Sequence, residues 1–566
     1  MGIKLAVSLV SLHTQYFLRF FFSFKAAPFI MVQYTVPTDL MSRRHPKGFQ
    51  TKTISKTRST KSQHAPLKLD TLLTELLFEI LDWMELKDAL RFRLVSRRFA
   101  ELVLLAPSIL KRALRHIKAP LPYSPKPIQS LSGKETISLC RRAFALEENW
   151  KRKLDRVKSK SFFALHRPYH LALAPGGRYL ISAYHSTSGS EQYVGLYDLE
   201  NPYGTALIAS CPTRSPIDSL TVTWIVNKGR QGIAIAWVRE LPFEKRATKV
   251  AGTEVVVLFI SLEDIEALTN PHHGRKESPF EVLFSRQWKV GAIRLSLAND
   301  TLAVARSPGT LTFYNLEDGR RSAIELPDLP HSTMSDPVIF ATKLLCDGTA
   351  LVIRGESGHS QTLNLHAIEA YQIPLWGTMH QAPMPLQCNY VHANQTNYTI
   401  SEMYRLQPTC DNPSEEEIAE ANGYYPAVTI CVESSEPNRG ITQYRLYPTR
   451  EPETKESEAR FSYIWPVTVW QGHYSEHDAF RTRTRSLAGA DRSLGFPYTA
   501  PGRALTPTLG EFMVLSSFGE DNIPSVALPQ PLESDIIQCV AWDESSGKLV
   551  LSTAGDLKVW VLDFAV

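Results

Sequence analysis

The sequence predicts an α+β multidomain protein in which a small all-α module of three helices precedes a large, mainly antiparallel all-β domain. Between residues 73 and 84, apolar side chains recur at the spacing of one helix face, and two more short helices follow. From about residue 162, short apolar strands alternate with Gly, Asn and Asp turns. With 566 residues and 43% hydrophobic side chains, the chain can hold two or more folded units, which excludes a mostly disordered, collagen-like or simple coiled-coil protein.

The first 65 residues are basic. They carry ten Lys or Arg against the single Asp39, a local charge of +9 in a chain whose net charge is +5. Residues 42–65 are polar and have too few large apolar groups to bury a core. We therefore expect 1–65 to be a disordered or targeting segment, followed by a nearly neutral folded body that does not indicate a nucleic-acid partner.

An apolar stretch at residues 3–36 leaves three interpretations open. Basic residues interrupt it, and its longest early uncharged run, Leu5–Leu18, is shorter than the roughly 20 residues that span a bilayer. The stretch is a dispensable tail or gene-model artefact before Met31 or Met41, a targeting segment, or a membrane anchor. No membrane partner is expected for the folded body.

The helical module begins after Pro66. Asp88 is expected to cap the second helix, which runs through the apolar residues up to Val95, and Ser96 is expected to cap the third, with Phe99 facing inward. Three such helices bury little surface, so a partner or neighbouring domain should cover part of them. The stripe on the first helix consists of Leu73, Leu76, Leu77, Ile80, Leu81 and Met84.

These residues carry a family resemblance. Leu72–Leu81, followed by Asp88–Phe99 with its Leu-Val-Ser-Arg-Arg-Phe ending, resembles an F-box. Leu73 stands where the family usually has Pro, which favours a first helical turn, so the helix start and adaptor affinity could be weaker here. The alternative is an amphipathic packing module within a larger domain. The resemblance implies that a Skp-type adaptor binds Leu72, Leu73, Glu75, Leu76, Leu77, Ile80, Leu81, Leu94, Val95 and Phe99.

The chain is divided accordingly. We predict an F-box at 66–112, a helical linker at 113–160 and a β-propeller-like domain at 161–566 with a long insertion at about 447–512. Helices are expected at 107–118 and at 133–153. The end of the second, with Asn149 and Trp150, resembles the segment that joins the F-box to the propeller in F-box/WD-repeat proteins.

The β-rich body reads as repeated units. Units end near Leu199, Leu262, Leu316 and Leu365, which are 63, 54 and 49 residues apart, and each has room for a four-stranded sheet with insertions. That repetition predicts a β-propeller of six to eight blades, and the unit ending at 557–563 is the most similar to a WD repeat. A pair of β-sandwiches is the competing fold. In the fourth unit we place strands at 338–344, 350–354 and 361–365.

Two insertions and one histidine pair complete the candidate features. Ser414–Glu420 is acidic, and Arg450–Leu509 mixes charges with Trp and Arg, so it is either a surface insertion or a substrate-contact arm. His272 and His273 are adjacent in a polar loop and are expected to be a solvated turn rather than metal ligands. No nucleotide loop, metalloprotease motif or nucleophile elbow is present, so we expect no catalysis, no metal and no cofactor.

The resemblance implies a function that composition alone does not reach. An F-box joined to a propeller implies a substrate adaptor of a cullin-based (SCF-type) ubiquitin ligase, with a Skp-type adaptor, through it a cullin, and an unknown protein substrate as partners. The alternatives are a scaffold that binds the adaptor without cullin and, less favoured, a propeller enzyme. Seven scattered cysteines without a CxxC pair fit a reducing compartment, cytoplasmic and/or nuclear. Substrate and oligomeric state are not encoded in these motifs.

Overall fold

The computed structural model describes most of the chain from residue 72 onward, and residues 1–71 lie outside it. The interpretations of the N-terminus, of His272 and His273, and of Ser414–Glu420 therefore concern residues outside the described part. The described residues are 72–105, 107–114, 130–151, 157–185, 191–201, 204–241, 252–269, 279–288, 293–307, 309–329, 337–345, 349–356, 365–377, 379–380, 387–392, 395–401, 428–434, 441–450, 461–464, 470–472, 483–487, 492–498, 511–516, 525–527, 537–553 and 557–565.

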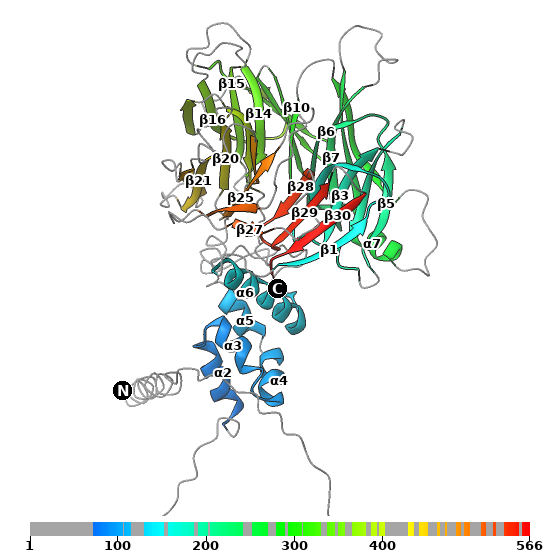
Figure 1. Cartoon of the computed structure of the whole chain (residues 1–566). Coiled ribbons are helices and arrows are strands. Elements are labelled where there is room, and N and C mark those ends of the chain that lie inside the picture. Colours follow the sequence, from blue (N-terminus) through cyan, green and yellow to red (C-terminus); the bar gives the residue numbers. More distant parts are fainter. Residues whose placement is uncertain are drawn as a thin grey trace, which may run out of the picture. The chain divides into compact units, whose positions relative to one another are not determined.

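Five helices of the described part precede the strands (Figure 1). They are α2 (Thr74–Asp82), α3 (Leu86–Phe92), α4 (Arg97–Leu105), α5 (Pro107–Leu114) and α6 (Gly133–Lys151). The predicted helices at 107–118 and 133–153 correspond to α5 and α6. None of the described helices is both long and apolar enough to cross a membrane.

The boundaries of α3 differ from the prediction. Asp88 lies in the first turn of α3 and does not cap it, because the helix already begins at Leu86, after Glu85 in an extended conformation. The helix ends at Phe92, so Leu94 and Val95 follow it in a turn. The cap predicted at Ser96 is confirmed, since its Oγ accepts a hydrogen bond from the N–H of Phe99 at 3.2 Å.

The strands form seven sheets within the described residues. The first sheet contains β2 (Pro168–Leu173), β3 (Tyr179–His185), β4 (Gln192–Asp198) and β5 (Ala206–Pro212), and the second contains β6 (Ile217–Asn227), β7 (Arg230–Glu240), β8 (Thr253–Ser261) and β9 (Glu281–Trp288). The third contains β10 (Ile293–Ala298), β11 (Thr301–Arg306), β12 (Thr310–Asn315), β13 (Arg321–Glu325) and β17 (Met379–His380). The fourth contains β14 (Pro337–Leu344), β15 (Thr349–Glu356), β16 (Leu365–Gln372) and β18 (Gln387–His392).

The remaining three sheets use the rest of the chain and one earlier strand. The fifth contains β19 (Gln395–Ile400), β20 (Val428–Ser434), β21 (Ile441–Arg450), β22 (Phe461–Ile464) and β23 (Trp470–Gly472), and the sixth contains β24 (Arg483–Leu487), β25 (Arg492–Tyr498), β26 (Glu511–Ser516) and β27 (Ser525–Ala527). The closing sheet contains β28 (Ile537–Asp543), β29 (Lys548–Thr553) and β30 (Lys558–Asp563), with β1 (Lys158–Phe163) as its outer strand.

This arrangement is a β-propeller. Neighbouring strands within a sheet pair antiparallel, except β13 and β17, which pair parallel. The first strands of neighbouring sheets approach one another in the series β28, β2, β6, β10, β14, β19, β24. The closing sheet pairs β1 with β30, so a strand from before the first sheet completes the last one. The all-β prediction is confirmed, while the range of six to eight blades stays a prediction.

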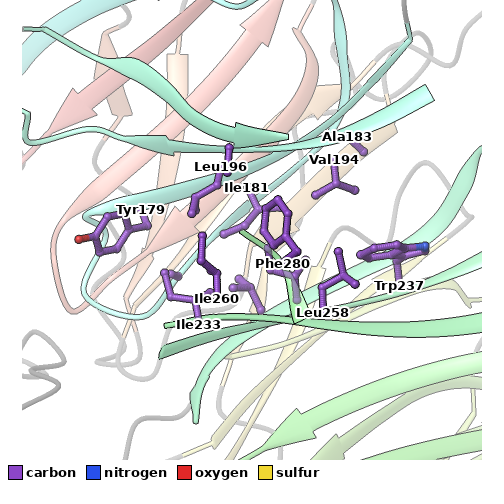
Figure 2. Packing of buried hydrophobic residues seen from close by; sticks show 14 of the residues in the cluster. Tyr179, Ile181, Ala183, Val194, Leu196, Ile233, Trp237, Leu258, Ile260 and Phe280 are labelled. Atoms are coloured by element: carbon purple, nitrogen blue, oxygen red, sulfur yellow. The ribbon is translucent and has the colours of Figure 1, made fainter. Parts of the chain in front are cut away.

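The hydrophobic cores lie between neighbouring sheets. Side chains of the first and second sheets face one another in one cluster, which Figure 2 shows with Ile181 and Leu196 on one side and Ile233, Leu258 and Ile260 on the other. Further clusters join the second to the third sheet, the third to the fourth, the fourth to the fifth, and the closing sheet to the first. Each of the first four sheets is therefore apolar on both faces, which explains the nearly continuous apolar character of their strands.

Three strand or helix assignments differ from the expectation. The third strand of the fourth sheet is β16, which begins at Leu365, where the predicted strand 361–365 ends. A short helix, α7 (Leu262–Thr269), follows β8 and was not predicted. The range 447–512, expected to be an insertion, contains β22, β23, β24 and β25.

Candidate docking surface on the helical module

The helices α2–α6 share one hydrophobic core. Leu77, Leu81 and Phe99, which the sequence assigned to adaptor binding, are buried in it with at most 2% of their surface exposed. Phe92 stacks on Phe99 with ring centroids 4.0 Å apart. Side chains this deeply buried offer no area to a partner, so in this conformation they hold the helices together. Their core neighbours are Ala89, Leu102, Val103, Leu110, Ile137 and Cys140.

A second set of the assigned residues is exposed. Leu73, Leu76, Leu94 and Val95, which we call the docking surface, leave between 42% (Leu76) and 73% (Leu94) of their surface accessible. Arg98 donates a hydrogen bond from Nη2 to the backbone oxygen of Leu72 at 2.8 Å, which joins the start of α4 to the start of α2. Arg98 follows the turn with Leu94 and Val95, and Leu72 precedes Leu73, so this bond ties together the two segments that carry the four exposed side chains.

The other assigned residues border this surface. Leu72 and Ile80 are half-buried against the core, and Glu75 is exposed in the first turn of α2, where a carboxylate stabilises the helix dipole. Leu73 itself is the N-cap of α2 in an extended conformation with φ −60° and makes no side-chain capping bond. That φ is the value proline would impose, so Leu73 adopts the backbone conformation of the family's Pro without its ring.

Two exposed arginines lie close in the chain to Leu94 and Val95. Arg91 and Arg97 are exposed, and their ion pairs with Asp88 (3.8 Å) and Glu101 (3.0 Å) are surface pairs that contribute little. Burial, together with the nearby Arg141, lowers the pKa of the Arg93 guanidinium. In the core behind the surface, burial raises the pKa of the Cys140 thiol to about 12, so this thiol stays neutral.

Helix α6 contacts both the helical module and the closing sheet. It begins with a capping box, in which the backbone N–H of Ser132 donates to Glu135 Oε2 at 2.8 Å and the N–H of Glu135 donates to Ser132 Oγ at 3.3 Å. Ile137 lies in the helical core, whereas Leu146 packs on the closing sheet.

Polar contacts reinforce the α6 end at the closing sheet. Arg142 Nε donates to the backbone oxygen of Ser546 at 2.9 Å, and its Nη2 lies 3.0 Å from Asp563 Oδ1. Asn149 is buried and donates from Nδ2 to the backbone oxygen of Phe564 at 2.7 Å. The Asn149 position, which the sequence linked to F-box/WD-repeat proteins, therefore has a structural role.

Sequence reasoning gave no role to the two apolar residues of the module that are exposed by more than three quarters. Trp83 follows α2 and Leu105 ends α4, and both are largely exposed. Helical periodicity assigns them no role, because it reports which face is apolar and not how much of a residue the neighbouring helices cover. Their only signal is a large apolar residue at a helix end.

Comparison with known proteins identifies the module. Residues 69–109 match the F-box domain, a range that holds α2, α3, α4 and the start of α5. Residues 69–109 are an F-box domain. No curated protein sequence matches the chain.

Solved structures resemble the chain at low identity. The β-propeller domain of Cps50 (Swd1) from Myceliophteria thermophila has a TM-score of 0.39 and 9% identity, covering 71% of this chain and 98% of its own. The C-terminal WD40 domain of Sif2 has a TM-score of 0.35 and 10% identity, covering 72% and 98%. Chaetomium thermophilum Raptor has a TM-score of 0.40 and 9% identity, covering 83% and 35%.

Proposed function

We propose that this F-box and β-propeller chain is the substrate-recognition adaptor of an SCF-type cullin ubiquitin ligase. The F-box binds a Skp-type adaptor, which bridges to a cullin, and the propeller binds a protein substrate. The chain itself performs no bond chemistry. It accelerates ubiquitin transfer by holding substrate and ubiquitin-loaded enzyme together, which converts a bimolecular encounter into an intramolecular one.

The observation that carries this proposal is the apolar docking surface on a domain of the matching family. Leu73, Leu76, Leu94 and Val95 come from two segments and remain exposed although the helical core beneath them is complete. Exposing four large apolar side chains to water is unfavourable for so small a module, and such exposure is typical of an interaction site. A partner that covers them recovers about 25 cal/mol for each Å² of apolar surface removed from water.

The test separates docking from folding. The full chain is co-expressed with a Skp-type adaptor and a cullin, and co-purification is compared between wild type and Leu94→Ala/Val95→Ala. Each truncation of an interface anchor costs about 1–2 kcal/mol, so adaptor affinity should fall roughly 30-fold to 1,000-fold. The matched control is Leu375→Ala, because Leu375 is 82% exposed but lies in the propeller between β16 and β17.

Each outcome bears on one part of the proposal. Adaptor and cullin bound to wild type and to the control, and lost from the double variant, support it. Adaptor without cullin would replace it by a non-degradative scaffold. If wild type binds neither protein, the F-box of this chain is not a ligase module.

We further propose that the protein acts in the cytoplasm or nucleus. Among the described residues, Cys140 and Cys211 are free thiols, which fits a reducing compartment. Fluorescence microscopy of the full chain tagged at its C-terminus tests this, and a signal confined to a membrane-bounded organelle would contradict it.

A further inference from the structure

A short segment joins the closing sheet to the first sheet and exposes apolar side chains. Residues 163–167 run from the end of β1 to the start of β2, and within them Phe163 and Leu165 are exposed while Ala164 is buried. Leu557, just before β30, is exposed as well. These three side chains, which we call the closure patch, leave between 40% and 70% of their surface accessible.

The two backbone segments that carry the closure patch lie side by side. Phe163 lies opposite Lys558 in the β1–β30 ladder, and the backbone N–H of Ala164 donates to the oxygen of Leu557 at 2.9 Å. Of the six large apolar residues that are exposed in the described part of the propeller, three belong to this patch, and the others are Val226, Val282 and Leu375. Exposed apolar residues that gather on adjacent segments mark interaction sites more often than scattered single residues do.

Aromatic rings support the segment. The His166 ring lies 5.2 Å from the ring of Tyr184 and 6.5 Å from that of Tyr193, and the two tyrosine rings stack at 5.7 Å. The backbone N–H of Leu165 donates to the hydroxyl of Tyr197 at 3.4 Å. Because these contacts hold the backbone in place, the closure patch is organised before any partner arrives, which lowers the entropy cost of binding.

The border of the closure patch is cationic. Lys558 Nζ lies 5.5 Å from the centroid of the Phe163 ring, and Arg167, an exposed residue, donates from Nε to Gln538 at 2.8 Å. Tyr193, whose ring lies 6.5 Å from the His166 ring, donates from its hydroxyl to the Glu191 carboxylate at 2.5 Å. A partner that places a carboxylate beside an apolar anchor therefore matches both parts of the site.

We propose that the closure patch binds a protein segment that carries an apolar or aromatic side chain flanked by a carboxylate. This rests on the proposed function in that the segment belongs to the substrate. The patch lies at the end of β1 and the start of β30, whereas Arg142 of α6 contacts Asp563 at the end of β30. Six residues of strand, about 20 Å, separate the two contacts, so a bound segment leaves α6 undisturbed.

The experiment selects ligands on the protein itself. The purified full chain is panned with a phage-displayed library of random 12-residue peptides, and selected peptides are synthesised and titrated by fluorescence anisotropy. We expect sequences with Leu, Phe or Trp within three positions of Asp or Glu. Phe163→Ser/Leu165→Ser should weaken their binding about tenfold or more, as for the loss of interface anchors. The matched control, Val226→Ser/Val282→Ser, removes two exposed apolar side chains elsewhere and should leave affinity unchanged.

A charge exchange tests the second half of the site. Lys558→Glu should weaken binding of the selected acidic peptides and strengthen binding of the same peptides with Lys in place of Asp or Glu. Thermal unfolding of each variant shows that the fold is retained. The proposal is overturned if no peptide binds, if the peptides bind the Phe163/Leu165 variant equally, if basic peptides are selected, or if the patch proves to pair two copies of the chain by light scattering.

The two proposals fail separately. Peptide binding needs neither adaptor nor cullin, so it survives if the F-box proves inactive. Retained adaptor binding in Phe163→Ser/Leu165→Ser, together with unchanged peptide affinity, would leave the ligase assignment standing and remove only the closure patch.

Discussion

Replacing Leu146 by alanine tests how firmly α6 is held against the closing sheet. Leu146 is fully buried and packs with Leu549, Leu551, Leu562 and Phe564. The contact is tight, because a Cβ placed on Gly547 would lie only 2.6 Å from Leu146 Cδ1. The substitution removes the side chain that fills this space and leaves the polar contacts of Arg142 and Asn149 in place.

The magnitude follows from burial. Leu→Ala substitutions at fully buried sites cost about 2–5 kcal/mol, and the cost is highest where the surroundings cannot collapse into the cavity. Here the cavity is bordered by strands β29 and β30, whose ladder fixes their spacing, so we expect the upper half of that range. Local opening of the α6 contact should then become roughly 300-fold to several thousand-fold more frequent, at tenfold for each ~1.4 kcal/mol.

Native-state hydrogen exchange with mass spectrometry measures that opening. Exchange should accelerate in the second half of α6 and in the turn at residues 543–547, while α2 and α4 remain protected. The matched control is Leu139→Ala on the same helix, where the side chain is only partly buried and packs on the helical module. If Leu146→Ala leaves exchange in these segments unchanged, Leu146 does not carry the contact and the reasoning is refuted.

Three further predictions concern single sites. Leu73→Pro should stabilise the helical module by about 0.4–1 kcal/mol and slow amide exchange in α2, since φ is already −60°; faster exchange would contradict it. Glu369→Gln should cost about 3–5 kcal/mol in denaturant unfolding because Arg354, bonded to it at 2.6 and 2.9 Å, is buried, while Arg354→Met/Glu369→Leu should recover most of that loss. Burial opposes ionisation of Glu254, but hydrogen bonds from Arg239 and Ser285 outweigh this effect and lower the pKa of its carboxyl group. The ionised carboxylate therefore stabilises the fold above pH 4.5, and this contribution is lost as the pH falls further. Glu254→Gln should make the free energy of unfolding depend less on pH in that acid range.

Local chemistry determined most of the helical module. The apolar stripe from Leu73 to Met84, the Ser96 cap and Pro107 at a helix start each act within one or two turns, so the sequence alone located α2, α4 and α5. The start of α3 was predicted wrongly because Asp is a favoured N-cap residue and Glu is not, which placed the cap at Asp88 instead of Glu85. Contacts with α5 and α6 decide that boundary, and they are remote in sequence.

The strands of the propeller were predicted from the sequence less completely than the helices. Short apolar runs located β2, β3, β10 and β11, whose side chains are buried or half-buried on both faces. The strand β16 lacks such a run because it contains His366 and Glu369, and the buried Glu369 is paired with Arg354 on the neighbouring strand β15. Likewise the pairing of β1 with β30 joins residues about 400 positions apart, and no local sequence pattern predicts which strand β1 pairs with.

The docking surface depends on a distinction that periodicity does not make. Leu76 and Leu77 are neighbours on one apolar stripe, yet Leu76 is 42% exposed and Leu77 is fully buried. A stripe wider than about 100° can serve two purposes, since one edge meets the helical core and the other meets a partner.

A joint substitution of Leu76 and Leu77 would therefore lose adaptor binding through unfolding as readily as through lost contact. Leu94 and Val95 lie outside the helices, so their substitution removes apolar area from the surface and leaves the core of Leu77, Leu81 and Phe99 intact. If that variant loses adaptor binding while the amides of α2 remain protected from exchange, the loss comes from the missing surface contacts and not from unfolding.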